Sequence, residues 1–258
     1  MPQSKGRQTS HVGATSAVSP SLRAKRSNPG AARLPLDCFV AGPPRNDEGR
    51  DGPEGGVPAR PKSLASPATV QRRRALCAAP HIARLRPLLD ALRRDGEVPD
   101  PDPLDGGADA RLLLLLETPG PRIRTSGFVS RDNPSETSAN LFRALAEAEI
   151  ARRDTLIWNT VPWIIHAPGA LNRAPRRAEI AAGIARLPDW LDALPRLACI
   201  VLAGRVAAEA APVLSRHRSG LPVLRMPHPS PTYLCTSPTH PARVRAAMAE
   251  AAAILGTA

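Results

Sequence analysis

The sequence predicts an α/β fold in which a four-stranded parallel sheet is flanked by helices on both faces. Four short apolar runs, bounded by Gly, Pro or polar residues, indicate buried strands. Longer segments with apolar residues at helical spacing separate these runs. Strands connected through such helices pair in parallel by right-handed crossovers. We therefore expect one domain of this kind over residues 75–258.

Residues 1–74 are expected to form a disordered basic extension. They hold 13 Lys and Arg against 5 Asp and Glu, together with 10 of the 30 Pro and 8 of the 18 Gly. Almost no periodic apolar pattern accompanies this composition, which is typical of chains that cannot bury a core. Most of the net charge of +12 therefore lies ahead of the domain.

The first part of the domain predicts a helix, a loop and a strand. Gly96 ends a segment with apolar residues at helical spacing, which are Ile82, Leu85, Leu88, Leu89 and Leu92. Residues 97–109 are acidic and rich in Pro and Gly, which favours a loop. Residues 112–116 are all leucine, and this short, well-bounded run favours a buried strand over a helix.

A second helix is predicted to begin at residues 133–136. Asn133 is suited to the N-cap, Pro134 to the first helical position, and Glu136 to closing a capping box. Its inward face consists of Leu141, Leu145 and Ala148.

The remaining elements alternate in the same way. Strands are predicted at 155–158, 199–202 and 222–226. Helices are predicted at about 176–194, with a break near Pro188, and at about 206–215. A last amphipathic helix begins near His240 and carries Val244, Met248, Ala251 and Leu255. The complete pattern contains four strands separated by helices.

Composition excludes several classes of protein. No run of 18 apolar residues occurs, so no membrane-spanning helix is expected, and no apolar stretch near the N-terminus resembles a secretory signal. The four cysteines lie far apart, without the spacing of a zinc or iron–sulfur site. We therefore expect a cytoplasmic protein with reduced cysteines and no cofactor.

Three polar motifs directly follow predicted strands. The first is Glu117-Thr118-Pro119-Gly120, the second is Asn159, and the third is His228-Pro229-Ser230. Ligands of open α/β sheets bind at the carboxyl ends of the strands. The three motifs therefore outline a candidate pocket at one edge of the sheet.

These motifs, in this order and with Phe128 after the first, resemble the uracil-DNA glycosylase superfamily over roughly residues 75–258. The resemblance implies a monofunctional DNA glycosylase that hydrolyses the N-glycosidic bond of uracil, or of a related deaminated or damaged base, in base excision repair. It implies a nucleoid-associated protein that binds DNA, and we expect a monomer. Single-stranded and duplex DNA stay open as substrates.

The resemblance also assigns roles to residues. Phe128 would stack on the flipped base, Asn159 would read its Watson–Crick edge, and His228 would stabilise the departing anionic base. The alternatives are a core phenylalanine, a strand-terminating asparagine and a turn histidine. DNA contacts would come from Ser230 at a phosphate, from Tyr233 and Leu234 as wedges, and from Arg173, Arg176 and Arg177. The wedge residues could instead pack on the domain, and arginine runs on helices are usually solvated faces.

The first motif departs from the patterns of the superfamily. Thr118 stands where some members carry a water-activating Asp, which leaves Glu117 as the catalytic carboxylate or as a structural group. Pro119 and Gly120 would line the base site. Gly120 stands where some members carry a Tyr that blocks the thymine methyl, so it leaves room at base C5. Trp158 and Trp163 flank Asn159 and would exclude water from it.

Residues 75–258 contain 22 Arg and no Lys. Schiff-base chemistry requires an amine that can lose its proton, and arginine cannot supply one. A glycosylase of this composition would therefore leave the abasic site uncut.

Two alternative functions remain open. Ser230 could act as a nucleophile with His228 as its base, although the sequence lacks the nucleophile-elbow pattern. The protein could also bind nucleic acid without catalysis, for which the loss of the Asp at Thr118 is the main argument.

Overall fold

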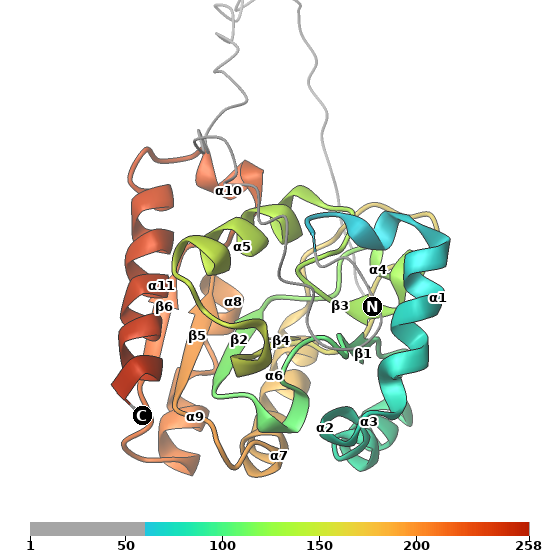
Figure 1. Ribbon diagram of the computed structural model, residues 1–258, viewed down its shortest axis with the longest axis horizontal. Coiled ribbons are helices and arrows are strands. Elements are labelled where there is room, and N and C mark those ends of the chain that lie inside the picture. Colours follow the sequence, from blue (N-terminus) through green and yellow to red (C-terminus); the bar gives the residue numbers. More distant parts are fainter. Residues whose placement is uncertain (1–59, 258) are drawn as a thin grey trace, which may run out of the picture. The chain divides into compact units, whose positions relative to one another are not determined.

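The computed structural model describes residues 60–257 (Figure 1). Of the extension predicted for residues 1–74, residues 1–59 lie outside the described residues. No helix in the described part of the chain is long and apolar enough to cross a membrane.

A four-stranded parallel sheet forms the centre of the fold, as predicted. Its strands are β2 (Leu112–Leu116), β4 (Thr155–Asn159), β5 (Cys199–Ala203) and β6 (Val223–Met226), in the order β4-β2-β5-β6. The register pairs Leu116 with Asn159 and Ala203 with Met226. The residues of β4 and β5 are all buried, as expected for strands covered on both faces.

Helices flank this sheet, which confirms the predicted fold class (Figure 1). Helix α5 (Glu136–Glu147) packs on α11 (His240–Thr257), and α11 in turn packs on β5 and β6. Helix α7 (Leu187–Ala193) packs on α9 (Ala211–His217). The ring of Trp190 on α7 lies 4.3 Å from that of Trp158, centroid to centroid, which ties this helix to β4.

Three predicted helices are each split in two. The pairs are α2 (Pro80–Ala83) with α3 (Arg86–Arg93), α6 (Arg177–Ala185) with α7, and α8 (Arg205–Ala208) with α9. A proline occupies the second position after each break: Pro87, Pro188 and Pro212. Proline has no N–H to continue the preceding helix and its ring crowds the carbonyl one turn earlier, so the chain restarts there. Only the break near Pro188 was predicted.

Helix α5 begins two residues later than predicted. Its N-cap is Ser135, whose hydroxyl accepts a hydrogen bond from the Ser138 amide at 3.1 Å. Asn133 instead donates its side-chain amide to the Phe128 carbonyl at 2.8 Å. The side chain expected to cap the helix is therefore used to hold the preceding loop.

The folded region begins earlier than the predicted boundary at residue 75. Residues 60–74 contain most of helix α1 (Pro67–Ala75) and the short turn η1 (Ser63–Ala65). Leu64 and Val70 are buried, and the Leu64 amide donates to the Asp132 carbonyl at 3.1 Å. Residues 60–74 therefore belong to the folded domain.

Shorter elements connect the main ones. Strand β1 (Asp100–Pro101), which lies in a region predicted as a loop, pairs in parallel with β3 (Phe128–Val129). Helices α4 (Ile123–Ser126) and α10 (Pro231–Leu234) follow the first and third motifs, and 3₁₀ turns lie at Leu76–Ala78, Gly107–Asp109 and Arg152–Asp154. Both motif-bearing loops are thus held by a short helix.

Candidate active site

The three polar motifs lie along the carboxyl edge of the sheet. Asn159 ends β4, Glu117 directly follows β2, and His228 lies two residues beyond β6. Parallel strands are spaced about 4.8 Å apart, so an edge of four strands spans roughly 15 Å. The strand order therefore brings these three residues to one side of the sheet, as the sequence predicted.

Asn159 is a buried residue whose side-chain amide makes no hydrogen bond within residues 60–257. The residue is 2% exposed, and within residues 60–257 no group hydrogen-bonds its side-chain oxygen or nitrogen. The backbone beside it is fixed, because Thr160 and Val161 donate to the carbonyls of Leu116 and Glu117 at 2.8 and 3.0 Å. The amide oxygen and nitrogen of Asn159 are not among the fully buried unpaired polar atoms. An amide in this position can offer one acceptor and two donors to a ligand at the edge of the sheet.

His228 is held in one tautomer. The backbone N–H of Ser230 donates to its Nδ1 at 3.2 Å, so the proton of the neutral ring is on Nε2. Burial lowers the pKa of His228 to about 4, which keeps the imidazole neutral at physiological pH. The side chain therefore presents an uncharged N–H donor at Nε2.

Gly204 allows this histidine to approach the end of β5. A Cβ atom built on Gly204 would lie 2.9 Å from the Cβ of His228, and the backbone φ of Gly204 is +89°. Both conditions require glycine at this position.

Asn140 supports the same turn and was not identified from the sequence. Its side-chain amide donates to the Pro229 carbonyl at 2.9 Å, and the residue is 6% exposed. Helix α5 thereby fixes the His228-Pro229-Ser230 turn through a positioning residue.

Glu117 supplies a carboxylate at the carboxyl edge of the sheet. Its side chain is half-buried, and this burial raises its pKa, while Arg205 at the start of α8 opposes the shift. A carboxylate with a raised pKa between Asn159 and His228 is suited to orienting water or to balancing positive charge on a sugar.

The rest of the first motif is partly open. No atom lies within 4 Å of a Cβ built on Gly120, whereas Pro119 is buried and Thr118 is half-buried. His166, on the loop after β4, lies beside Pro119. Burial lowers its pKa and the Pro119 carbonyl opposes that shift. The loops after β2 and β4 therefore meet next to the candidate site.

The structure places Phe128 in a small core of its own. Its side chain is 1% exposed and packs against Leu64 and Val70. This position corresponds to the alternative that Phe128 is a core phenylalanine. Base stacking by Phe128 stays a prediction. Trp158 likewise packs on Trp190 rather than around Asn159, while Trp163 donates from its indole nitrogen to the Leu92 carbonyl at 3.0 Å.

The two predicted wedge residues differ in their exposure to solvent. Leu234 is 2% exposed and belongs to the main core, which corresponds to the alternative that it packs on the domain. Tyr233 is 44% exposed and stacks on His240 with ring centroids 4.8 Å apart. Ser230 is half-buried at the N-cap of α10. Of the pair, Tyr233 is the exposed residue, and its contact with DNA stays a prediction.

The three predicted phosphate-binding arginines also differ from one another. Arg173 forms two hydrogen bonds to Glu179, at 2.9 and 2.6 Å, and one to the Ile165 carbonyl. Arg176 is exposed, and its backbone N–H donates to Glu179. The Arg177 side chain is 87% exposed, although it pairs with Glu209 at 3.0 Å. Arg173 therefore holds the loop, whereas Arg176 and Arg177 face solvent.

The sequence that builds this edge of the sheet matches a known protein family. The sequence model of the uracil DNA glycosylase superfamily matches residues 103–252, more than half of the chain. The chain belongs to that superfamily. No curated protein matches it. The matched region includes every predicted site residue, and it begins after helix α1.

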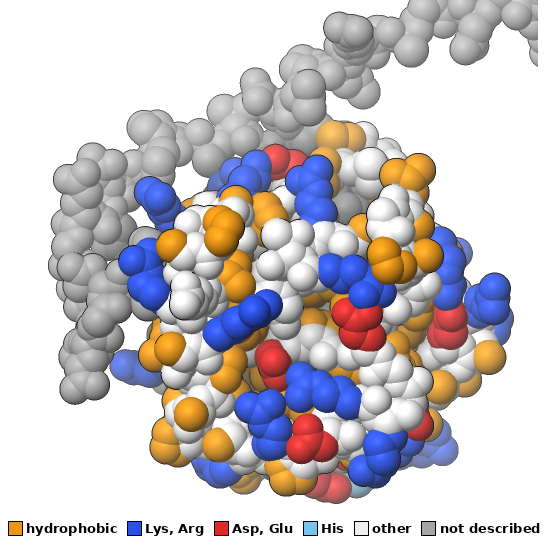
Figure 2. All heavy atoms as spheres, turned by 90° about the vertical axis from the view of Figure 1, so that its right-hand side faces the viewer, with side chains coloured by type: hydrophobic (Ala, Val, Ile, Leu, Met, Phe, Trp, Pro, Cys, Tyr) orange, Lys and Arg blue, Asp and Glu red, His pale blue; other side chains and the backbone are white. Residues whose placement is uncertain are grey.

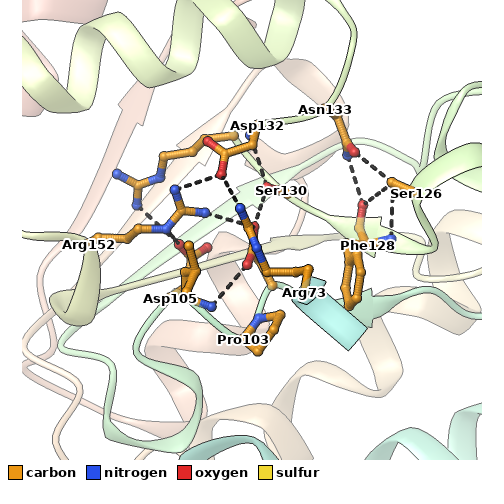
Figure 3. A network of polar contacts seen from close by, with 12 residues as sticks. Arg73, Pro103, Asp105, Ser126, Phe128, Ser130, Asp132, Asn133 and Arg152 are labelled. Carbon is orange, nitrogen blue, oxygen red and sulfur yellow. Dashed lines mark hydrogen bonds and ion pairs between the residues drawn. The ribbon is translucent and has the colours of Figure 1, made fainter. Parts of the chain in front are cut away.

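A buried ionic network joins helix α1 to this superfamily domain (Figure 3). Arg73 pairs with Asp102 and with Asp132, the latter at 3.0 Å, and all three side chains are fully buried. Arg152 reaches the same two carboxylates at 2.7 and 2.9 Å and also Asp105 at 2.9 Å. The network thus joins four segments that are distant in sequence.

The charges of this network are balanced but costly to bury. Arg131 lies 3.6 Å from Asp105, so three arginines face three aspartates. Burial raises the pKa of Asp105 to about 7, against the opposing effect of Arg152 and Arg131. Ser130 adds a hydroxyl donor to Asp102. Removing one member would leave a buried charge without compensation.

Figure 2 shows the side of the molecule on which α1 lies in Figure 1. Basic, acidic and hydrophobic side chains alternate there. Several basic residues of the domain pair with carboxylates, as in Arg93 with Asp100 at 2.7 Å and Arg124 with Glu97. A mixed surface of this kind attracts a polyanion less than a continuous basic stripe does.

Proposed function

We propose that the protein is a monofunctional DNA glycosylase that hydrolyses the N-glycosidic bond of uracil, or of a closely related deaminated base, flipped out of DNA. The reaction would start base excision repair and would need water but no cofactor. The proposed setting is the nucleoid-associated cytoplasm, with the protein acting as a monomer. Membership of the superfamily supports glycosylase chemistry, and the site supports the choice of base.

One observation carries the proposal: Asn159 ends β4 at the carboxyl edge of the sheet, and its side-chain amide has no hydrogen-bond partner within residues 60–257. Its oxygen can accept from N3–H of uracil while its nitrogen donates to O4. Cytosine presents the reverse pattern at these two positions. The direction of the hydrogen bonds would therefore select uracil over cytosine.

His228 would supply most of the catalytic effect. As the glycosidic bond breaks, negative charge develops on the base, including O2. A neutral imidazole that donates from Nε2 stabilises this charge without itself needing to lose a proton. Glu117 would orient the water that attacks the sugar and would balance the positive charge that builds there.

Open space at Gly120 would widen the range of bases that the site accepts. Because nothing lies within 4 Å of a Cβ at this position, the site would accept uracils that carry a substituent at C5. Thr118 would leave the water-activating role to Glu117.

We expect Asn159→Ala to lower kcat/KM for uracil release at least about tenfold, because two hydrogen bonds to the base are lost. Release from a uracil-containing oligonucleotide measures this effect. Gln71→Ala changes an exposed amide on α1 and serves as the control. Equal rates for the wild type and Asn159→Ala would contradict readout by this side chain.

A non-catalytic DNA-binding protein is the competing function. It would bind the uracil oligonucleotide without releasing base, and Asn159→Ala would leave binding unchanged. Serine chemistry is disfavoured by geometry. The backbone N–H of Ser230, rather than its hydroxyl, contacts His228, and the hydroxyl accepts from Thr232 at 3.4 Å.

No covalent adduct is expected when borohydride is added during turnover. The folded region does contain one lysine, Lys62, which pairs with Glu136 on the surface. Gel analysis of the full chain with labelled DNA tests this expectation. An adduct that disappears in Lys62→Arg would show Schiff-base chemistry and would overturn the monofunctional assignment.

A further inference from the structure

The main chain of the first motif is tied at both ends but not in its middle. The backbone N–H of Val161 donates to the Glu117 carbonyl at 3.0 Å. At the other end, the backbone N–H of Ile123 donates to the Gly120 carbonyl, also at 3.0 Å. In the described part of the chain, no backbone hydrogen bond reaches residues 118–119, which lie between these two carbonyls. A side chain is therefore needed to fix the middle of the motif.

His166 is the side chain that meets this stretch. It lies on the loop after β4 and is 4% exposed. The backbone N–H of Arg173 donates to its Nδ1 at 3.2 Å, so the proton of the neutral ring is on Nε2. Burial lowers the pKa of His166, and the Pro119 carbonyl opposes this shift by accepting from the ring. That carbonyl therefore lies next to Nε2.

Nε2 of His166 is a buried donor in need of an acceptor. The protein encloses this nitrogen, and among residues 60–257 it forms no hydrogen bond of normal geometry. A buried N–H donor that stays unpaired costs free energy. The Pro119 carbonyl is the acceptor at hand, and a small movement of the first motif completes the bond.

The surrounding contacts hold His166 in this direction. Arg124 donates to the His166 carbonyl at 3.1 Å, and Arg173 donates from its Nε to the neighbouring Ile165 carbonyl at 3.2 Å. Arg173 is itself paired with Glu179. Arg124 belongs to α4, the helix that follows the first motif. His166 therefore joins the loop after β4 to the first motif through both its main chain and its ring.

We propose that His166 is a positioning residue for base release, whose Nε2–H donates to the Pro119 carbonyl and fixes the first motif so that Glu117 faces the sugar. This inference rests on the proposed function and adds a residue that acts through Glu117 without touching the substrate. A group that must orient water is sensitive to displacements of about 1 Å. His166 should therefore affect the chemical step more than the binding of DNA.

Two substitutions of His166 separate its two hydrogen bonds. Glutamine places an amide nitrogen near the position of Nε2 and keeps the donor to Pro119. Asparagine places its amide oxygen near the position of Nδ1 and keeps the acceptor for Arg173. Each variant loses one of the two bonds, so a purely structural role would affect both alike. Urea denaturation checks that both variants fold.

For uracil release from an oligonucleotide, we expect His166→Asn to lower kcat about tenfold and to change KM less than about twofold. His166→Gln should retain kcat within about threefold. His217→Asn, at an exposed histidine paired with Asp192, is the control for the substitution itself. Equal kcat values in the two His166 variants, a larger loss in His166→Gln, or a loss that appears only in KM would overturn the proposal.

A second measurement does not depend on catalysis. Amide hydrogen exchange of Ile123, whose N–H donates to the Gly120 carbonyl, reports how firmly the first motif is held. Exchange should be faster in His166→Asn than in the wild type and unchanged in His166→Gln. If the wild type releases no base but this pattern is found, the proposed function fails and the hold of His166 on the first motif stands. If exchange is the same in all three proteins, the inference is overturned.

Discussion

Replacing His228 by alanine is expected to slow base release by about 10²–10³-fold, because this is the usual cost of removing one preorganised donor to a developing anion. The loss should appear in kcat, since the hydrogen bond strengthens only as charge moves onto the base. Single-turnover release from a uracil oligonucleotide measures it directly. His217→Ala, an exposed histidine paired with Asp192, is the matched control and should retain the wild-type rate.

The dependence of the wild-type rate of base release on pH should distinguish the titration of His228 from that of Glu117. Because burial lowers the pKa of His228 to about 4, its titration adds no inflection near pH 6.5. The pKa of Glu117 is raised, so the rate should fall on acidification at a pH above the usual value for a glutamate. An inflection near pH 6.5 that disappears in His228→Ala would contradict a permanently neutral imidazole.

Arg73→Ala is expected to lower the free energy of unfolding by about 3–5 kcal/mol, because removing one partner of a buried ionic network leaves uncompensated charge. Asp102 and Asp132 would then depend on Arg152 for a positive partner within this network. A loss of this size is a large fraction of the stability of an ordinary domain. Urea denaturation measures it.

The neighbouring Arg72→Ala supplies the comparison. Arg72 is exposed on the same helix, and we expect its replacement to change the free energy of unfolding by less than about 0.5 kcal/mol. Equal effects of the two substitutions would contradict a special role of buried charge at Arg73.

The strands were predictable because each is a short apolar run with clear boundaries. Helix breaks were harder, since the apolar period continues past Pro87 and Pro212 although the backbone restarts there. Helix α1 escaped prediction for a different reason. Its central buried side chain is Arg73, and patterns of hydrophobic residues cannot reveal a helix held by ion pairs.

The site was predictable where the topology fixes it. Asn159, Glu117 and His228 follow parallel strands, so the sheet alone places them on one edge. Phe128 follows no strand of that sheet, and nothing in its sequence neighbourhood shows that the ring turns toward Leu64. Asn140 contacts Pro229 across 89 positions of sequence, a separation that no local pattern reports.

The backbone amide on Nδ1 of His228 has a consequence for reactivity. Since the ring has no free lone pair for taking up a proton, the electron pair released by the broken bond must stay on the departing heterocycle. The logarithm of the rate of base release should then rise linearly as the pKa of the leaving base falls. Electron-withdrawing groups at C5, which the empty space over Gly120 would admit, should accelerate departure.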